Sequence, residues 1–191
     1  RGTYIAAGFV VSAESSPQWR KDMAQDFAKK FVNTPERYGH VQVTELGAPD
    51  LWTMAPPASA DRVLTFRNVH NGMSGGYEKE MFAAMFVALK PGGKLGVVEH
   101  RANPNATLEQ MKLSGYVTEA YVIQLAESAG FKLQAKSEIN ANPKDSKDYP
   151  KGVWTLPPSL RLGDQDKQKY LDIGESDRMT LRFVKPKTTT P

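Results

Sequence analysis

An alternation of strand-like and helix-like segments over most of the chain is the feature that most constrains the fold. Short apolar runs rich in β-branched and aromatic residues, such as 2–11, 61–69 and 94–100, have the pattern of buried strands. Between them, apolar residues recur at helical spacing, for example over 81–89. Alternating strands and helices favour a parallel sheet that helices cover on both faces.

The expected elements run in order along the chain. Strands are predicted over 2–11, 41–46, 61–69, 94–100, 131–139 and 178–184, and helices over 17–32, 81–89 and 117–130, with short turns of helix after Thr107 and Asp164. The last two strands have no long helix between them, which favours an antiparallel edge strand. The predicted fold class is therefore α/β, a doubly wound, mostly parallel sheet with an antiparallel edge strand and helices on both faces.

Length and composition narrow the class further. The 191 residues suit one domain, which we place at 1–184 with a flexible tail at 185–191. Cysteine is absent, which excludes disulfides, thiolate zinc sites and a cysteine nucleophile. The net charge is 25 − 21 = +4, but the basic runs are short and no apolar stretch approaches a membrane span. We therefore expect neither a nucleic-acid partner nor a membrane.

Polar residues that follow the strands are the candidates for chemistry, because ligands bind at the carboxyl ends of parallel strands. His70 and His100 follow consecutive strands, so both imidazoles are expected at one edge, beside a nucleoside-sized hollow. Histidine suits general-base work, and the alternative is that each ring satisfies loop backbone groups; for His100 the functional role is the favoured one. A metal site of His70, Glu99 and His100 is a weaker alternative, because ligands from separate strands leave no spacing signature. We assign no metal.

A family pattern emerges between Asp61 and His100, where DRVLTFRNVHN is followed by a helix and ALKPGGKLGVVEH. This order resembles the middle of class I S-adenosylmethionine-dependent methyltransferases, which have a Rossmann-like fold. The stretches GYVT, ESAGF, SEINANPKDSKDYPKGVWTLPPSLRLG and GESDRMTLRFVKP extend the resemblance to a bacterial group of predicted methyltransferases over nearly the whole chain. Members of that group often carry a secretory signal, which favours a periplasmic or secreted location over the cytoplasm.

The resemblance implies S-adenosylmethionine as cofactor, a small-molecule substrate, and roles for particular residues. Glu45, Gly47 and Asp50 lie where the family contacts adenine, and Arg67, Asn68 and His70 where it flanks the methyl-bearing end of the cofactor. His100 and Arg101 would face the methyl acceptor, so that His70, His100 and Arg101 are the catalytic candidates. Tyr149, Trp154 and Thr155 would form a lid over the substrate.

Two departures from the family pattern matter. The family's first strand and its Gly-rich turn have no counterpart, and the strand that should end in a ribose-binding acid ends instead at Ala7 and Gly8. We therefore expect an N-terminally truncated domain. Its absent strand would be central, and its loss leaves either two unpaired sheet edges or a collapsed sheet.

Three functions follow from these observations. The leading prediction is methyl transfer to an unidentified small molecule. Under this prediction, the chain is either an active enzyme or an inactive fragment of one. The alternative, from another class, is a non-catalytic domain that binds a small ligand or a partner, with homodimers formed through an exposed sheet edge. A metal-assisted hydrolase using His70 and His100 is a distant third.

Overall fold

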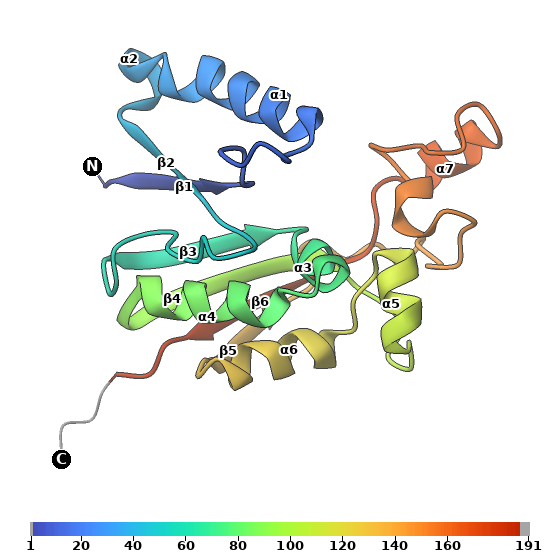
Figure 1. The fold of residues 1–191 in the computed structure, drawn as a ribbon. Coiled ribbons are helices and arrows are strands. Elements are labelled where there is room, and N and C mark those ends of the chain that lie inside the picture. Colours follow the sequence, from blue (N-terminus) through green and yellow to red (C-terminus); the bar gives the residue numbers. More distant parts are fainter. Residues whose placement is uncertain (1, 188–191) are drawn as a thin grey trace.

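A computed structural model gives the fold and describes residues 2–187 (Figure 1). A first, two-stranded sheet pairs β1 (Tyr4–Gly8) in parallel with β2 (Val41–Glu45). The crossover between them is α1 (Gln18–Phe27), its continuation η1 (Ala28–Val32) and the short α2 (Pro35–Tyr38). This is the helix predicted over 17–32, extended by one short turn of helix.

The second sheet has four strands in the order β3-β4-β6-β5. They are β3 (Ala60–Phe66), β4 (Leu89–His100), β5 (Lys132–Ser137) and β6 (Arg178–Val184). β3 and β4 are parallel, and β6 runs antiparallel to both β4 and β5. The predicted α/β class, mostly parallel with an antiparallel strand, is confirmed; that strand, β6, lies one position in from the β5 edge.

Helices and loops connect these strands. They are α3 (Val69–Gly75), α4 (Glu78–Ala88), α5 (Leu108–Ser114), α6 (Glu119–Ser128), η2 (Gly152–Thr155) and α7 (Lys167–Ile173). Thr107 caps α5 with the predicted capping box, since its side chain accepts from Gln110 N while the Gln110 side chain accepts from Thr107 N. No helix of the described residues is long and apolar enough to span a bilayer.

The core lies between one face of the four-stranded sheet and the helices α4 and α6. Leu95 and Phe183 from the strands and Phe82 and Val122 from the helices are each fully buried there. Burying one such side chain contributes about 1.5–3 kcal/mol. On the other face of β3, Leu64 and Phe66 remain 62% and 55% exposed, because alternate residues of a strand point to opposite faces.

The two sheets face each other across unpaired edges. β1 at the edge of the first sheet lies beside β3 at the edge of the second, and their arrows point the same way (Figure 1). Within residues 2–187 no strand lies between them. The edges of β1 and β3 that face each other are therefore both unpaired within the described residues.

Two local predictions are wrong. Residues 69–75 form the helix α3, where we expected the end of a strand and a glycine-rich break, because Gly72 fits within the helix and the left-handed Gly76 (φ 70°) ends it. β4 begins at Leu89, before the predicted Lys94, because Leu89 pairs with Ala60 of β3 and Lys185 pairs with Gly92 and Gly93. Most of the predicted tail, residues 188–191, lies outside the described residues.

Candidate functional site

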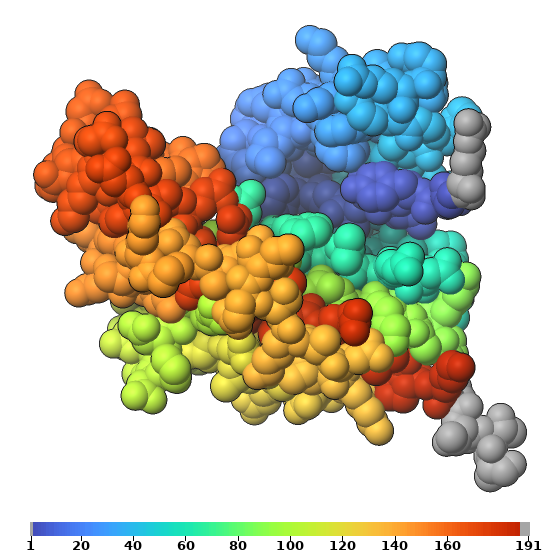
Figure 2. Space-filling model, turned by 180° about the vertical axis from the view of Figure 1, so that it is seen from behind, coloured from blue at the N-terminus to red at the C-terminus, as the bar shows by residue number. Residues whose placement is uncertain are grey.

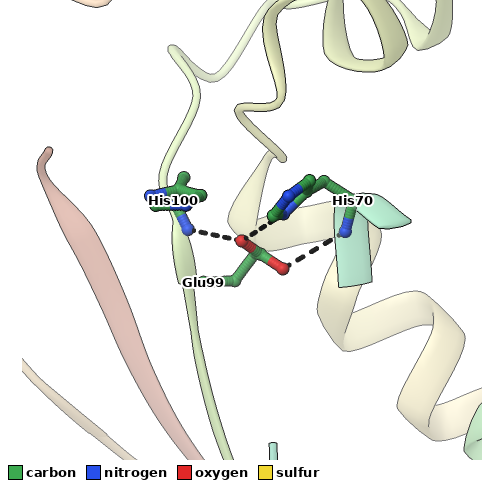
Figure 3. Close-up of side chains that lie close together, drawn as sticks. All are labelled: His70, Glu99 and His100. Atoms are coloured by element: carbon green, nitrogen blue, oxygen red, sulfur yellow. Dashed lines mark hydrogen bonds and ion pairs between the residues drawn. The ribbon is translucent and has the colours of Figure 1, made fainter. Parts of the chain in front are cut away.

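The site forms where β3 and β4 end side by side. His70 lies at the start of α3, directly after β3, and His100 is the last residue of β4. Their ring centroids are 5.2 Å apart, and the side chains are only slightly exposed (Figure 3). The prediction that these two strands are neighbours and bring both imidazoles to one edge therefore holds.

Glu99 is the centre of the cluster. Its side chain is fully buried and accepts hydrogen bonds from the backbone N–H of His70 (3.2 Å) and of His100 (2.8 Å). Its Oε1 also lies 3.0 Å from His70 Nδ1. A buried carboxylate needs such partners, because an unpaired one would be strongly destabilising. The sequence analysis gave Glu99 a role only in the weaker metal-site alternative and did not predict that it orients His70.

The contact with Glu99 decides which nitrogen of His70 is free. A carboxylate only accepts hydrogen bonds, so Nδ1 of His70 carries the proton that the contact requires. Nε2 then keeps its lone pair and can accept a proton from a substrate. Glu99 also holds the ring in one orientation and stabilises the positive charge that this transfer creates. The pair has the chemistry of an oriented general base.

The pKa of His100 differs from that of a histidine on the surface. Burial lowers its pKa from 6.5 to about 4; the charge of Glu99 opposes this effect, and those of His70, Arg67 and Arg178 add to it. Its Nδ1 lies 2.6 Å from Ser176 Oγ. At neutral pH the ring is therefore uncharged, and it offers a polar but neutral wall beside His70.

The same three side chains have the composition of a metal site. One ligand atom each from His70, Glu99 and His100 lies within 4.8 Å of the others. Two imidazoles and one carboxylate suit a divalent transition metal. However, Glu99 already accepts three hydrogen bonds and His100 Nδ1 is engaged by Ser176, so the protein completes this cluster with its own donors.

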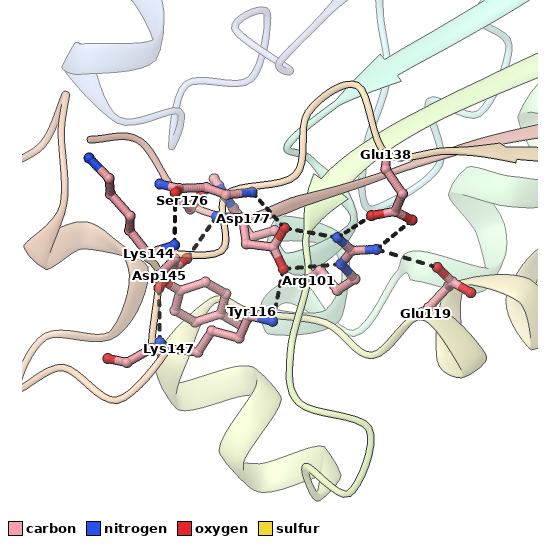
Figure 4. Close-up of polar contacts among 12 residues, drawn as sticks. Arg101, Tyr116, Glu119, Glu138, Lys144, Asp145, Lys147, Ser176 and Asp177 are labelled. Atoms are coloured by element: carbon pink, nitrogen blue, oxygen red, sulfur yellow. Dashed lines mark hydrogen bonds and ion pairs between the residues drawn. The ribbon is translucent and has the colours of Figure 1, made fainter. Parts of the chain in front are cut away.

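Arg101 follows His100 but belongs to a different network (Figure 4). It donates two hydrogen bonds to Glu138, at 3.0 and 2.7 Å, and two to Asp177, at 3.1 and 2.9 Å. With four of its N–H groups engaged by carboxylates, Arg101 fastens β4 to the segments around β5 and β6. Its role toward a methyl acceptor stays a prediction.

Asp177 and Asp145 connect this network to the long excursion after β5. Burial disfavours the charge of Asp177, but hydrogen bonds from Arg101, Lys147 and the Asn142 N–H outweigh it and lower the pKa to about 2. Asp145 accepts hydrogen bonds from the Tyr116 hydroxyl (3.0 Å) and from Asp177 N (2.7 Å). Burial raises the pKa of Tyr116, and Asp145 adds to the effect. The excursion is thus held by buried polar contacts.

Sequence reasoning missed Ser176, Asp177, Asp145 and Tyr116. A signal existed for the first two. They directly precede β6, and the amino end of an antiparallel strand lies at the same edge as the carboxyl ends of its parallel neighbours. Asp145 and Tyr116 gave no comparable signal, because their contact joins segments 29 residues apart in the sequence.

The predicted cofactor residues lie in two groups at the same end of the strands. After β2, Glu45 accepts hydrogen bonds from Ser12 N (3.0 Å) and the Ser12 hydroxyl, Gly47 pairs with Leu51, and Asp50 is exposed. After β3, Arg67 and Asn68 are exposed. Among the described residues no hydrogen bond or ion pair joins the two groups, which belong to different sheets.

The predicted lid residues have different surroundings. The Trp154 ring lies edge-on to His70, with centroids 6.0 Å apart. Tyr149 packs against Tyr170, and its hydroxyl accepts from Ser146 N. Thr155 is fully buried and accepts from Lys151 N. Of the three predicted lid residues, Trp154 is thus the one that lies beside the histidine cluster, whereas Thr155 holds the backbone of η2.

Two hollows open near this end of the molecule. One, of about 470 Å³, is lined by residues that include Arg101, Thr118 and Lys147; the other, of about 290 Å³, lies against Tyr149 and Trp154. Neither is lined by His70 or His100, which are 6% and 9% exposed. Neither hollow is therefore the nucleoside-sized one that we expected between the ends of β3 and β4.

Comparisons with known proteins place the fold. No protein-family model matches the sequence, and a search of curated sequences finds no significant match. Among solved structures, the [4+2]-cyclase SpnF is 14% identical with a TM-score of 0.58, and 89% of this chain covers 63% of its length. An S-adenosylmethionine-dependent methyltransferase from Methanosarcina mazei is 12% identical with a TM-score of 0.55, at 96% and 82% coverage.

A third neighbour was solved with a ligand. The Burkholderia thailandensis 1,6-didemethyltoxoflavin-N1-methyltransferase, with bound 1,6-didemethyltoxoflavin and S-adenosylhomocysteine, is 11% identical with a TM-score of 0.51, at 97% and 72% coverage. At sequence identities this low, the similarity shows a shared fold alone, and proteins with one fold catalyse many different reactions. The chain has the class I S-adenosylmethionine-dependent methyltransferase fold.

Proposed function

We propose that this protein, with its sheet complete, transfers a methyl group from S-adenosylmethionine to a small-molecule acceptor. The observation that carries the proposal is the pair of His70 and Glu99, placed where β3 and β4 end. Ligands of open α/β sheets bind at that edge, and a histidine oriented by a buried carboxylate is suited to take a proton there. The methyltransferase neighbours support the reaction class.

The chain's own residues would handle the proton. The cofactor supplies an electrophilic methyl group, and the acceptor must lose a proton from its attacking atom. His70 Nε2 accepts that proton, and Glu99 stabilises the imidazolium that results. His100 stays neutral, so it adds no charge that would repel this imidazolium. Trp154 borders His70 and limits the access of water.

The described residues fit the cofactor only in part. Glu45, Gly47 and Asp50 lie on the side of β2, and Arg67 and Asn68 lie on the side of β3. The end of β1, however, offers Ala7 and Gly8 where ribose hydroxyls would need a carboxylate, and Glu45 is already engaged by Ser12. We infer that a further strand completes the sheet between β1 and β3 and brings the remaining contacts. The two parallel, unpaired edges support this inference.

Calorimetry with S-adenosylhomocysteine tests the proposal. The protein expressed from the complete gene should bind it, and the 191-residue chain should bind it much more weakly. A His70→Gln variant should retain binding but lose most of its methyl transfer, because the loss of a general base costs about 10²–10⁴-fold. Absence of both heat and thermal stabilisation in the complete protein would exclude the methyltransferase.

A second candidate is a non-catalytic domain that binds a small ligand or a partner. The absence of an acid at the end of β1 and the open edges of β1 and β3 favour it. An open edge can pair with a second copy, so this candidate predicts a homodimer. Light scattering after size-exclusion chromatography distinguishes the two candidate functions. A dimer that does not bind S-adenosylhomocysteine supports the non-catalytic domain, and a monomer that binds it supports the methyltransferase.

The periplasmic or secreted location remains a proposal that the family resemblance supports. Fractionation of cells that express the complete gene, followed by detection of the protein in each fraction, tests it.

A further inference from the structure

The hollow beside Trp154 has an unusual combination of side chains. Leu113 and Pro150 contribute apolar surface, Tyr149 and Trp154 contribute aromatic rings, and Lys151 and Arg161 contribute positive charge. No acidic residue lines it. Its volume of about 290 Å³ is at the lower limit of small-molecule sites, enough for a single-ring compound.

The two cations are available to a ligand. Lys151 and Arg161 are exposed, and neither forms an ion pair or a side-chain hydrogen bond within residues 2–187. This contrasts with Arg101, whose guanidinium is held by two carboxylates. Unpaired cations at an aromatic wall attract an anion whose flat body can lie on the ring.

Backbone packing builds this hollow firmly. Arg161 N donates to Trp154 O at 2.9 Å, so the two residues are joined through their backbones. The Arg161 guanidinium lies over the indole, with Cζ 4.5 Å from the ring centroid. Gly115 and Gly152 let α5 and η2 approach closely, since a Cβ on Gly115 would lie 2.9 Å from Trp154 Cη2. Trp154 is thus fixed between α5, His70 and Arg161.

From these observations we infer that the hollow binds a planar aromatic carboxylate, with its ring on Trp154 and its carboxylate at Lys151 and Arg161. Trp154 contacts both this hollow and His70, so the bound acid lies next to the catalytic edge. The identification of the acid as the methyl acceptor rests on the proposed function. The binding itself needs neither cofactor nor reaction.

Calorimetry with benzoate and with its neutral isostere benzamide tests the inference on the chain as it is. Benzoate should bind, and benzamide should bind at least about tenfold more weakly, a difference of about 1.4 kcal/mol. Lys151→Gln and Arg161→Gln should each weaken benzoate binding several-fold without changing that of benzamide. Lys132→Gln, an exposed cation on β5, serves as the matched control and should change neither.

Three outcomes would overturn the inference: no heat with benzoate at millimolar concentrations, equal binding of benzamide, or an Arg161→Gln variant that binds benzoate as well as the parent. Urea unfolding of each variant shows whether it is folded, and the exposure of both cations predicts that it is. If the complete protein does not bind S-adenosylhomocysteine, the acid is not a methyl acceptor, but the binding site for the acid remains. Benzoate failure would leave the methyltransferase proposal intact.

Discussion

At the residue scale, the chemistry of the site depends on one buried carboxylate. Glu99 accepts hydrogen bonds from two backbone amides and one imidazole, so it fixes the geometry of α3 and of the end of β4 as well as the tautomer of His70. Such a group is costly to change, because its donors are buried and have no alternative acceptor there.

Replacement of Glu99 by glutamine tests this dependence. The amide keeps the size of the side chain but removes the charge and places an N–H₂ group against N–H donors. We expect a loss of about 1–3 kcal/mol in the free energy of unfolding, the range for a buried donor left unsatisfied. Glu127→Gln, on the exposed face of α6, is the matched control. Equal urea midpoints for both variants would contradict the role given to Glu99.

His100 predicts a pH dependence of stability. Its pKa is about 4 in the folded protein and 6.5 for an unperturbed histidine in the unfolded chain, so between these two pH values the unfolded chain binds more protons. Stability should therefore be fully present above pH 6.5 and fall toward pH 4, by up to about 3 kcal/mol at 1.36 kcal/mol per unit. Urea unfolding between pH 4 and 7.5 measures this slope, and the His100→Gln variant should lose that part of it.

At the scale of elements, the excursion between β5 and β6 is the part that the sequence described least. It contains η2 and α7, and Asp145, Tyr116 and Thr155 hold it through buried polar contacts. These contacts are polar and join residues far apart in the sequence, so the spacing of residues in the sequence does not predict them. Figure 2 shows residues 140–175, in orange and red-orange, as a lobe beside the blue N-terminal segment.

The contact of η2 with α5 predicts a sharp difference between two glycines. Gly152 and Gly163 both have positive φ, at 54° and 63°, so alanine strains the backbone alike at both. Only at Gly152 would the new Cβ also clash with the backbone of Ser114, whereas at Gly163 nothing lies within 4 Å. Gly152→Ala should therefore lower the thermal midpoint several degrees more than Gly163→Ala. Equal midpoints would show that η2 does not pack on α5 in solution.

The periodic elements, by contrast, could be predicted. β6 has the predicted bounds, and the capping box at Thr107 and the helix over 17–32 were found because local chemistry encodes them. α3 was missed since Gly72 and Gly75 suggested a break, whereas Gly72 lies within the helix close to Glu78 and the left-handed Gly76 ends it. The edge that carries His70 and His100 followed from strand order, but the partners of His100 and Arg101 depended on tertiary contacts.

At the scale of the whole molecule, the arrangement of the two sheets is the dominant feature. β4 is paired on both sides, by β3 and β6, whereas β3 and β1 are each paired on one side. Hydrogen exchange of the isolated chain should therefore leave about half the amides of β3 unprotected, while those of β4 from Lys94 onward are protected. Uniform protection of β3 would show that its open edge is covered in solution, by a second copy or by another strand.

The unpaired edges of β1 and β3 also make this chain a template for the addition of a strand. A synthetic peptide of strand-forming sequence, supplied separately, would need to pair only its backbone with two ready templates that point the same way. The rest of the fold, including the histidine cluster, is already assembled without it. Mixing the chain with such a peptide should therefore switch the protein from a form with two unpaired edges to a form in which both edges are paired.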